Sequence, residues 1–152
     1  MRLFALLFAV MASSSHVEAE VFDDSFRLSQ IKGVHVFLWD NAKGACWTNL
    51  REVREYAEEK LRMKGAKLVD PKMLPDMEQV YTLAIEVTSK RLYKNGTGAC
   101  WGYTHLGLMT GAMIHGSLHA ALIAEKRAAV REPANLNRHV IDRVSEFIAE
   151  FK

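Results

Sequence analysis

The chain contains two cysteines, and both lie in the same tetrapeptide, Gly-Ala-Cys-Trp. Cys46 belongs to the first copy and Cys100 to the second. A disulfide between them would close a loop of about 55 residues, worth about 4 kcal/mol of stability in the chain-entropy model. We therefore predict a structural disulfide, provided that the protein folds in an oxidising compartment. Free or metal-bound thiols and a redox pair are the alternatives, and the lack of a CxxC motif favours neither.

The first residues predict export. Arg2 precedes an apolar run, Leu3–Ala12, which has the length of a signal-peptide core and is too short to span a bilayer. Small residues follow, and we expect cleavage after Ala19; a retained N-terminal helix is the alternative. The predicted organisation is a removed signal peptide, residues 1–19, and one domain over residues 20–152. Its location would be the periplasm in a bacterium and the extracellular space otherwise.

Charge and motifs exclude several functions. The formal net charge is +2, with 20 Lys and Arg residues against 18 Asp and Glu residues. So small an excess, without a basic stripe, gives no support to a nucleic-acid partner, and we expect none. No second apolar stretch is long enough for a transmembrane segment. The motifs GxSxG, HExxH, GxGxxG and the P-loop are missing, so we assign no catalytic residue, cofactor or metal.

Hydrophobic periodicity predicts the first half of the fold. The segment Ile31–Asp40 is rich in β-branched and aromatic residues, which is typical of a strand. A helix should follow, because Asn49 begins a capping-box pattern and Gly65 is a stop signal. Val80–Ser89 then alternates between apolar and polar residues, which predicts a half-buried strand.

The second half contains two further strands and a helix. We expect strands at Ala99–Met109 and Met113–Lys126, joined around Thr110-Gly111, and a helix capped by Asn135. One face of this helix is apolar: Leu136, Val140, Val144, Phe147, Ile148 and Phe151. The predicted fold is an α+β two-layer sandwich of order β-α-β-β-β-α, with a largely antiparallel four-stranded sheet and two helices on one face.

One part of this pattern resembles a known group of proteins. The helix end "EEKLRMKG" (Glu58–Gly65), a loop and the strand "YTLAIEV" (Tyr81–Val87) resemble the small α/β modules of bacterial cell envelopes, such as the N-terminal domain of TolB. The resemblance implies a periplasmic scaffold or interaction module, and it implies no catalytic residue.

The third and fourth strands carry the candidate binding residues. A three-residue loop, Thr110–Ala112, would place Met109 opposite Met113 and His105 opposite Ser117. One face would then carry Trp101, Tyr103, His105, His115, Ser117 and His119. Three neighbouring imidazoles could bind Zn²⁺ or Cu²⁺, but ordinary solvent-exposed histidines and an aromatic binding surface are alternatives.

The register decides whether this cluster exists. A two-residue turn at Thr110-Gly111 would move the aromatic side chains to the core face and break the histidine cluster, because a slip of one residue reverses every side chain. Threonine is a poor residue for the positive φ of such a turn, so we favour the longer loop.

Three functions fit these observations, and an enzyme is the less favoured class. We favour an exported, non-catalytic interaction module that binds a protein or cell-envelope component through the third and fourth strands. The first alternative is a metal-binding protein or enzyme that uses His105, His115 and His119. The second is a component of an assembly, because "VFLWD" (Val36–Asp40) or "LHAALIAE" (Leu118–Glu125) would be adhesive at an uncovered sheet edge.

Overall fold

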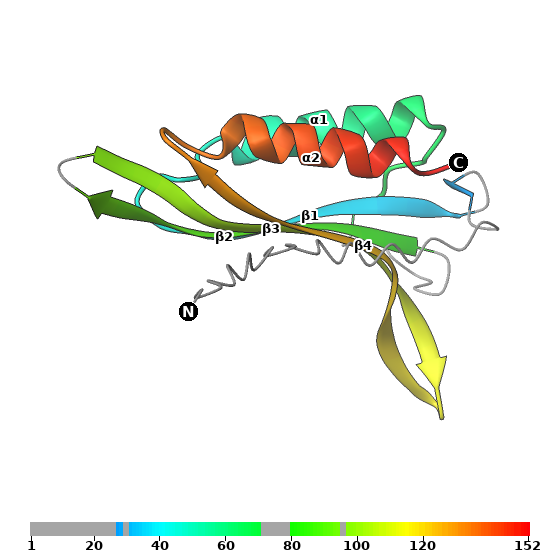
Figure 1. Ribbon diagram of the computed structural model, residues 1–152. Coiled ribbons are helices and arrows are strands. Elements are labelled where there is room, and N and C mark those ends of the chain that lie inside the picture. Colours follow the sequence, from blue (N-terminus) through cyan, green and yellow to red (C-terminus); the bar gives the residue numbers. More distant parts are fainter. Residues whose placement is uncertain (1–26, 29–30, 71–79, 95–96) are drawn as a thin grey trace, which may run out of the picture.

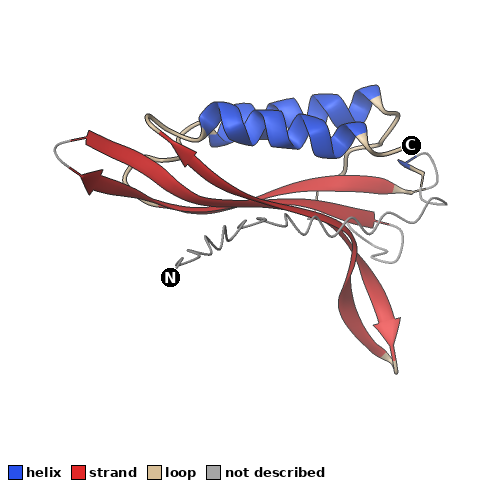
Figure 2. Ribbon diagram, in the orientation of Figure 1, coloured by secondary structure: helices blue, strands red, loops and turns tan. Residues whose placement is uncertain are grey.

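The computed structural model describes residues 27–28, 31–70, 80–94 and 97–152. They form two layers, a four-stranded sheet and a pair of helices that cover one of its faces (Figures 1 and 2). The elements follow the order β1 (Gly33–Ala42), α1 (Leu50–Met63), β2 (Val80–Lys94), β3 (Thr97–Ile114), β4 (Ser117–Glu132) and α2 (Asn137–Ala149). The α+β class and the element order predicted from the sequence are confirmed. The predicted signal peptide and its cleavage site lie outside the described residues.

The sheet has the simple spatial order β1-β2-β3-β4. β1 pairs with β2 in parallel, and the other two pairs are antiparallel, so the sheet is mixed but mostly antiparallel. β1 and β4 are therefore the edge strands, and they contain the two segments predicted to be adhesive. At the start of β1, the N–H of Val34 donates to the carbonyl of Lys67 (2.8 Å), and the N–H of Val69 donates to Val34 (3.1 Å).

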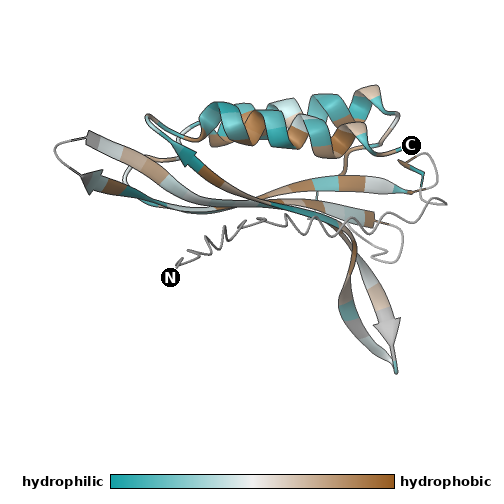
Figure 3. Cartoon of the chain, in the orientation of Figure 1, coloured by the Kyte–Doolittle hydropathy of each residue, from teal (hydrophilic) through white to brown (hydrophobic). Residues whose placement is uncertain are grey.

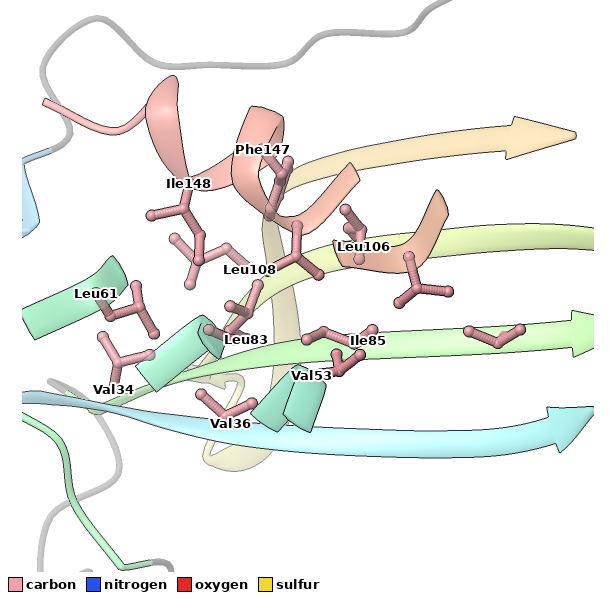
Figure 4. Close-up of a cluster of buried hydrophobic side chains, with 14 of the residues drawn as sticks. Val34, Val36, Val53, Leu61, Leu83, Ile85, Leu106, Leu108, Phe147 and Ile148 are labelled. Atoms are coloured by element: carbon pink, nitrogen blue, oxygen red, sulfur yellow. The ribbon is translucent and has the colours of Figure 1, made fainter. Parts of the chain in front are cut away.

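Alternation along the strands builds the core. In β2, Leu83, Ile85 and Val87 are buried toward the helices, while the residues between them are only partly buried. Burying an aliphatic side chain of this size stabilises the fold by about 1.5–3 kcal/mol. Figure 4 shows Leu83 and Ile85 facing the helices. The helices contribute Val53, Ala57, Leu61, Val140, Val144, Phe147 and Ile148, and Leu136 and Phe151 flank the second helix.

The helix boundaries differ in detail from the sequence prediction. α1 does begin after Asn49, but the side chain of Asn49 makes no capping bond to the backbone. Its amide nitrogen donates to Oε2 of Glu52 (2.9 Å), and its amide oxygen, the atom that would cap the helix, has no hydrogen-bond partner among the described residues. Gly65 ends the helix with a φ of +86°, as expected. α2 begins two residues after the predicted cap, and Oδ1 of Asn135 accepts a bond from the N–H of Asn137 (3.1 Å).

The predicted disulfide is present between Cys46 and Cys100. Arg91, which pairs with Cys100 across β2 and β3, adds polar contacts at the same end of the sheet. Its guanidinium donates to the carbonyl oxygens of Gly44 (2.8 Å), Ala45 (3.4 Å), Gly98 (3.2 Å) and Ala134 (2.7 Å). The rigid fork of donors on arginine suits such multiple bonding, so the disulfide and Arg91 together hold the β1–α1 loop and the β4–α2 loop against this end of the sheet.

The predicted connection between the third and fourth strands is wrong. Thr110 and Gly111 lie inside β3, and the turn is His115-Gly116, whose φ values are +50° and +80°. Two positive φ values are the mark of a type I′ hairpin turn. Histidine and glycine tolerate them better than threonine and glycine do. Met109 consequently pairs with Leu122 rather than with Met113.

The longer strands produce a projecting hairpin, residues 109–123, which we call the arm. The pairing of β2 with β3 ends at Thr110, and only β3 and β4 continue. The β3–β4 register shifts between Leu108 and Met109. Such irregularities bend a ribbon. The arm accordingly turns away from the helical layer (Figure 1). We call the rest of the described chain the body.

Within the described ranges, neither helix has the length and apolar character needed to cross a bilayer.

Candidate binding face of the sheet

The sheet face opposite the helices, here called the open face, carries the predicted aromatic residues. In β3 the even-numbered residues Thr104 and Leu106 are buried toward the helices. The odd-numbered residues Trp101, Tyr103 and His105 therefore point toward the opposite face. The prediction that these three side chains share one face is correct, although the strand pairing from which it was derived is not.

Four large aromatic side chains are half exposed on this face. The exposed fractions are 50% for Trp101 and 43% for Tyr103 on β3, and 45% for Phe37 and 58% for Trp39 on β1. The rings of Phe37 and Trp39 meet edge to face, with centroids 6.5 Å apart and planes at 81°. Aromatic residues at this exposure are costly to leave in water and are enriched at protein interfaces.

The second Gly-Ala-Cys-Trp copy differs from the first in the exposure of its tryptophan. Trp47 is 3% exposed and belongs to the core, whereas Trp101 lies on the open face. On β3, Trp101 pairs with Lys90 and Arg131 of its neighbouring strands. The repeated tetrapeptide thus supplies the two halves of the disulfide but presents its two tryptophans in different environments.

A polar network crosses the same face between the two aromatic pairs. Nε2 of His105 lies 3.0 Å from Oε2 of Glu125, and Nδ1 lies 3.5 Å from Oε2 of Glu86. The guanidinium of Arg127 lies 3.4 Å from Glu125, and the hydroxyl of Thr88 donates to Glu86 (3.2 Å). A neutral imidazole has one N–H, and an imidazolium has two. Only the protonated ring can therefore donate to both carboxylates.

The structure separates the predicted histidine cluster. His105 pairs with Arg127, whereas Ser117 pairs with Ile114 and His119 with Ala112 in the arm. His105 and Ala112 are seven positions apart on β3, which corresponds to roughly 23 Å along a strand. His115 lies in the turn at the tip. Among the described residues, no group of three His, Cys, Asp or Glu side chains is placed to hold a metal ion.

The sequence interpretation missed residues on the neighbouring strands. Phe37 and Trp39 alternate with the buried Val34 and Val36, and this alternation was a usable indication of their side of the sheet. Glu86 lies between buried apolar residues of β2 and could have been placed in the same way. Glu125 and Arg127 could not be placed, because their position depends on the true β3–β4 register.

A small hollow of about 270 Å³ lies beside the hydroxyphenyl ring of Tyr103 and is lined by Tyr103, Arg127, Ala128 and Ala129. Small-molecule sites usually enclose about 300–1,000 Å³ and cover most of the ligand surface. A sheet face with protruding aromatic rings and a hollow of only this size is better suited to a macromolecule than to a small substrate.

Two further histidines have altered acidity. Burial lowers the pKa of His139 on α2 below its usual value of 6.5, and the nearby charge of Arg143 lowers it further. Burial likewise lowers the pKa of His35 on β1, with a smaller contribution from Arg54. Both rings therefore favour the neutral form, which fits structural positions rather than charged binding positions.

No family model and no curated protein matches this chain. Some solved structures are loosely similar. A PelC variant dodecamer from Paraburkholderia phytofirmans has a TM-score of 0.46 and 12% identity over 82% of this chain and 91% of that chain. The hypothetical protein CT253 from Chlamydia trachomatis has a TM-score of 0.37 and 13% identity, with coverages of 77% and 98%. A putative neuraminyllactose-binding hemagglutinin homolog from Helicobacter pylori has a TM-score of 0.36 and 9% identity, with coverages of 86% and 89%. Similarities this weak assign nothing to this chain.

Proposed function

We propose that this protein is an exported, non-catalytic interaction module that binds a protein or cell-envelope component through the open face. The observation that carries the proposal is the set of four half-exposed aromatic rings on one face of the sheet. Tryptophan and tyrosine are the residue types that most often dominate binding energy at interfaces. The polar network around His105 would give such an interface directionality, because its charged groups require complementary partners.

The compartment part of the proposal depends on the disulfide. Cys46 and Cys100 are bonded, and structural disulfides persist mainly outside the reducing cytosol. The apolar run Leu3–Ala12 supports the same location, since it has the composition of a signal-peptide core. The resemblance to bacterial envelope modules would make that location a periplasm.

The metal-binding alternative has lost its geometric basis. It required His105, His115 and His119 on adjacent strand positions, and the observed register places the last two in the arm. We therefore keep binding through the aromatic residues and His105, and treat His115, Ser117 and His119 as part of a separate surface.

Site-specific photocrosslinking in the source cells tests the binding surface. We would introduce a photoreactive residue in place of Trp101 or Tyr103 of the full chain and identify the crosslinked species by mass. The same species should form from both positions. It should be lost, or reduced about tenfold, when the other ring of the pair is replaced by alanine.

Tyr93 provides the matched control. It is an aromatic residue of β2 that is 75% exposed, and by alternation it belongs to the opposite side of the sheet from Trp101 and Tyr103. A photoreactive residue at Tyr93 should give no such species, and Tyr93→Ala should leave crosslinking from Tyr103 unchanged. Equal crosslinking from Tyr93, or full crosslinking after Trp101→Ala in a folded variant, would disprove the proposed surface.

A further inference from the structure

The arm has no charged side chain. No Asp, Glu, Lys or Arg occurs between Lys94 and Glu125, although such residues make up 25% of the chain. In Figure 3 the arm is mostly pale or brown, with short hydrophilic stretches. The body half of β4 contains Glu125, Lys126, Arg127, Arg131 and Glu132. Charged residues on an edge strand prevent pairing with other chains. The edge of β4 is therefore protected in the body and unprotected in the arm.

Within the described ranges, both edges of the arm offer backbone groups that have no partner strand. Beyond Thr110, β3 no longer has β2 beside it. On its other side, β4 has no partner strand within the described part of the chain. A two-stranded hairpin is marginally stable in water unless further strands or a packing surface support it. Additional strands would therefore stabilise the arm, and the arm has the backbone hydrogen-bonding groups to pair with them.

The two faces of the arm are also suited to packing. On one face Met109 pairs with Leu122 and Gly111 pairs with Ala120. Leu122 is 49% exposed, although it is a large aliphatic residue. On the other face Thr110 pairs with Ala121, and Ala112 pairs with His119. Small residues predominate, so a further strand or a second ribbon can approach the backbone closely.

We propose that the arm joins copies of this chain. The β4 edge of one arm pairs with the free β3 edge of the next arm, residues 111–114, and the apolar faces of Met109 and Leu122 form a continuous strip. The occupant is a second copy because that partner has an uncharged strand of matching length and brings no like-charge repulsion. β3 and β4 are antiparallel, so arms projecting side by side in the same direction continue the sheet in the antiparallel sense.

This contact uses two different edges of each arm, so it is heterologous. Heterologous contacts generate closed rings when the rotation between copies closes, and filaments when it does not. It also leaves the open face of each body unused. Self-association through the arm and binding of a partner through Trp101 and Tyr103 can therefore be tested separately.

Sedimentation and light scattering of the full chain, at low and high micromolar concentration, test the proposal. The mass of the wild-type chain should exceed that of a monomer and increase with concentration. The variant A120K/L122K places two positive charges on the arm and should weaken association by about tenfold or more. M63K is the matched control, since it adds a charge at an exposed apolar residue at the end of α1, in the body and away from the open face. It should associate like the wild type.

Unfolding curves of the variants establish whether the body remains folded. If the lysine variant does not fold, a chain in which residues 110–121 are replaced by Asn-Gly shortens the arm and should be monomeric. A wild-type chain that stays monomeric at every concentration would overturn the proposal, and so would an oligomer that the arm variants do not change. A monomer that sediments with phosphatidylglycerol vesicles through its arm would also overturn it, because the occupant would then be lipid.

Discussion

The body half and the arm half of the β3–β4 ribbon consist of the same two strands but differ in what supports them. In the body, the helices cover one face, and residues such as Thr104 and Leu106 are buried. In the arm, helices and β2 are both missing beside the ribbon (Figure 1). The transition is abrupt. It occurs at the register shift between Leu108 and Met109, where the ribbon leaves the four-stranded sheet.

This difference shows that regular strand pairing alone does not mean that a ribbon is packed against other elements of the fold. Both halves have an unbroken ladder of backbone partners apart from the shift. The body gains its stability from buried side chains and covalent linkage, whereas the arm has mainly its own ladder. We infer that the body determines the fold and that the arm is available for intermolecular contact. Changes in the body should therefore alter the free energy of unfolding, and changes in the arm should alter association.

Removal of the disulfide is the largest change we expect in the body. The variant C46A/C100A opens a loop that spans a sequence separation of 54 residues. The free energy of unfolding, measured in denaturant, should fall by about 4 kcal/mol, because the unfolded chain regains the entropy of that loop. The wild type measured with reductant provides the control and should show a similar loss.

This experiment also sharpens the comparison. Where C46A/C100A remains folded, its association through the arm should resemble that of the wild type, since residues 109–123 contain neither cysteine. A loss of less than about 1 kcal/mol would contradict the prediction. It would mean that Arg91 and the buried core hold this end of the sheet without the covalent bond.

The sequence allowed most of the body to be predicted, because its patterns are local. Alternation in β2 and the apolar stripe of α2 depend only on neighbouring residues, and both were correct. The arm could not be predicted, because the pairing of β3 with β4 depends on which of two dipeptides ending in glycine forms the turn. Thr110-Gly111 and His115-Gly116 both allow a hairpin turn. The choice of turn determines which residue of β4 lies opposite each residue of β3, including His105. The partners Glu125 and Arg127 were missed for that reason.

Two glycines of β3 test how tightly the body is packed, one far from the arm and one next to it. A Cβ at Gly102, in the body, would lie 2.6 Å from Cα and Cβ of Ser89 and would also strike the carbonyl oxygen of Thr88. Gly102→Ala should therefore lower the free energy of unfolding by about 1–3 kcal/mol, as overpacking does. Denaturant unfolding monitored by circular dichroism measures the loss.

Gly107, at the base of the arm, is the matched control. A Cβ there would meet only the end of the Leu122 side chain closely, at 3.3 Å from Cδ1. That side chain can rotate away, and alanine reduces the entropy of the unfolded chain, so Gly107→Ala should change stability by less than about 1 kcal/mol. Equal losses at Gly102 and Gly107 would show that the base of the arm is packed as tightly as the body.

The smallest expected effect is on the pH dependence of stability. It separates the body from the arm because the histidines of the two parts differ in how far their side chains are buried. Nε2 of His139 is buried with no hydrogen-bond partner among the described residues, and burial lowers the pKa of this imidazole below 6.5. The unfolded chain then binds protons more tightly than the folded chain does. Stability is thus fully present above pH 6.5 and decreases as the pH falls toward the lower pKa of the folded state. His115 and His119 in the arm are exposed instead.

Replacement of His139 by glutamine should make this part of the stability profile flatter. Unfolding free energies of the wild type and His139→Gln would be compared at mildly alkaline pH, where the imidazole is neutral in both states, and then at mildly acidic pH. The difference in unfolding free energy at alkaline pH measures the packing cost of the substitution. The change in this difference at acidic pH measures the contribution of protonation of His139. His35 has the same direction of shift, so some slope should remain in the single variant and decrease in His35→Gln/His139→Gln. An unchanged slope in the double variant would mean that carboxyl groups, rather than these two partly buried imidazoles, control the acid sensitivity of the body.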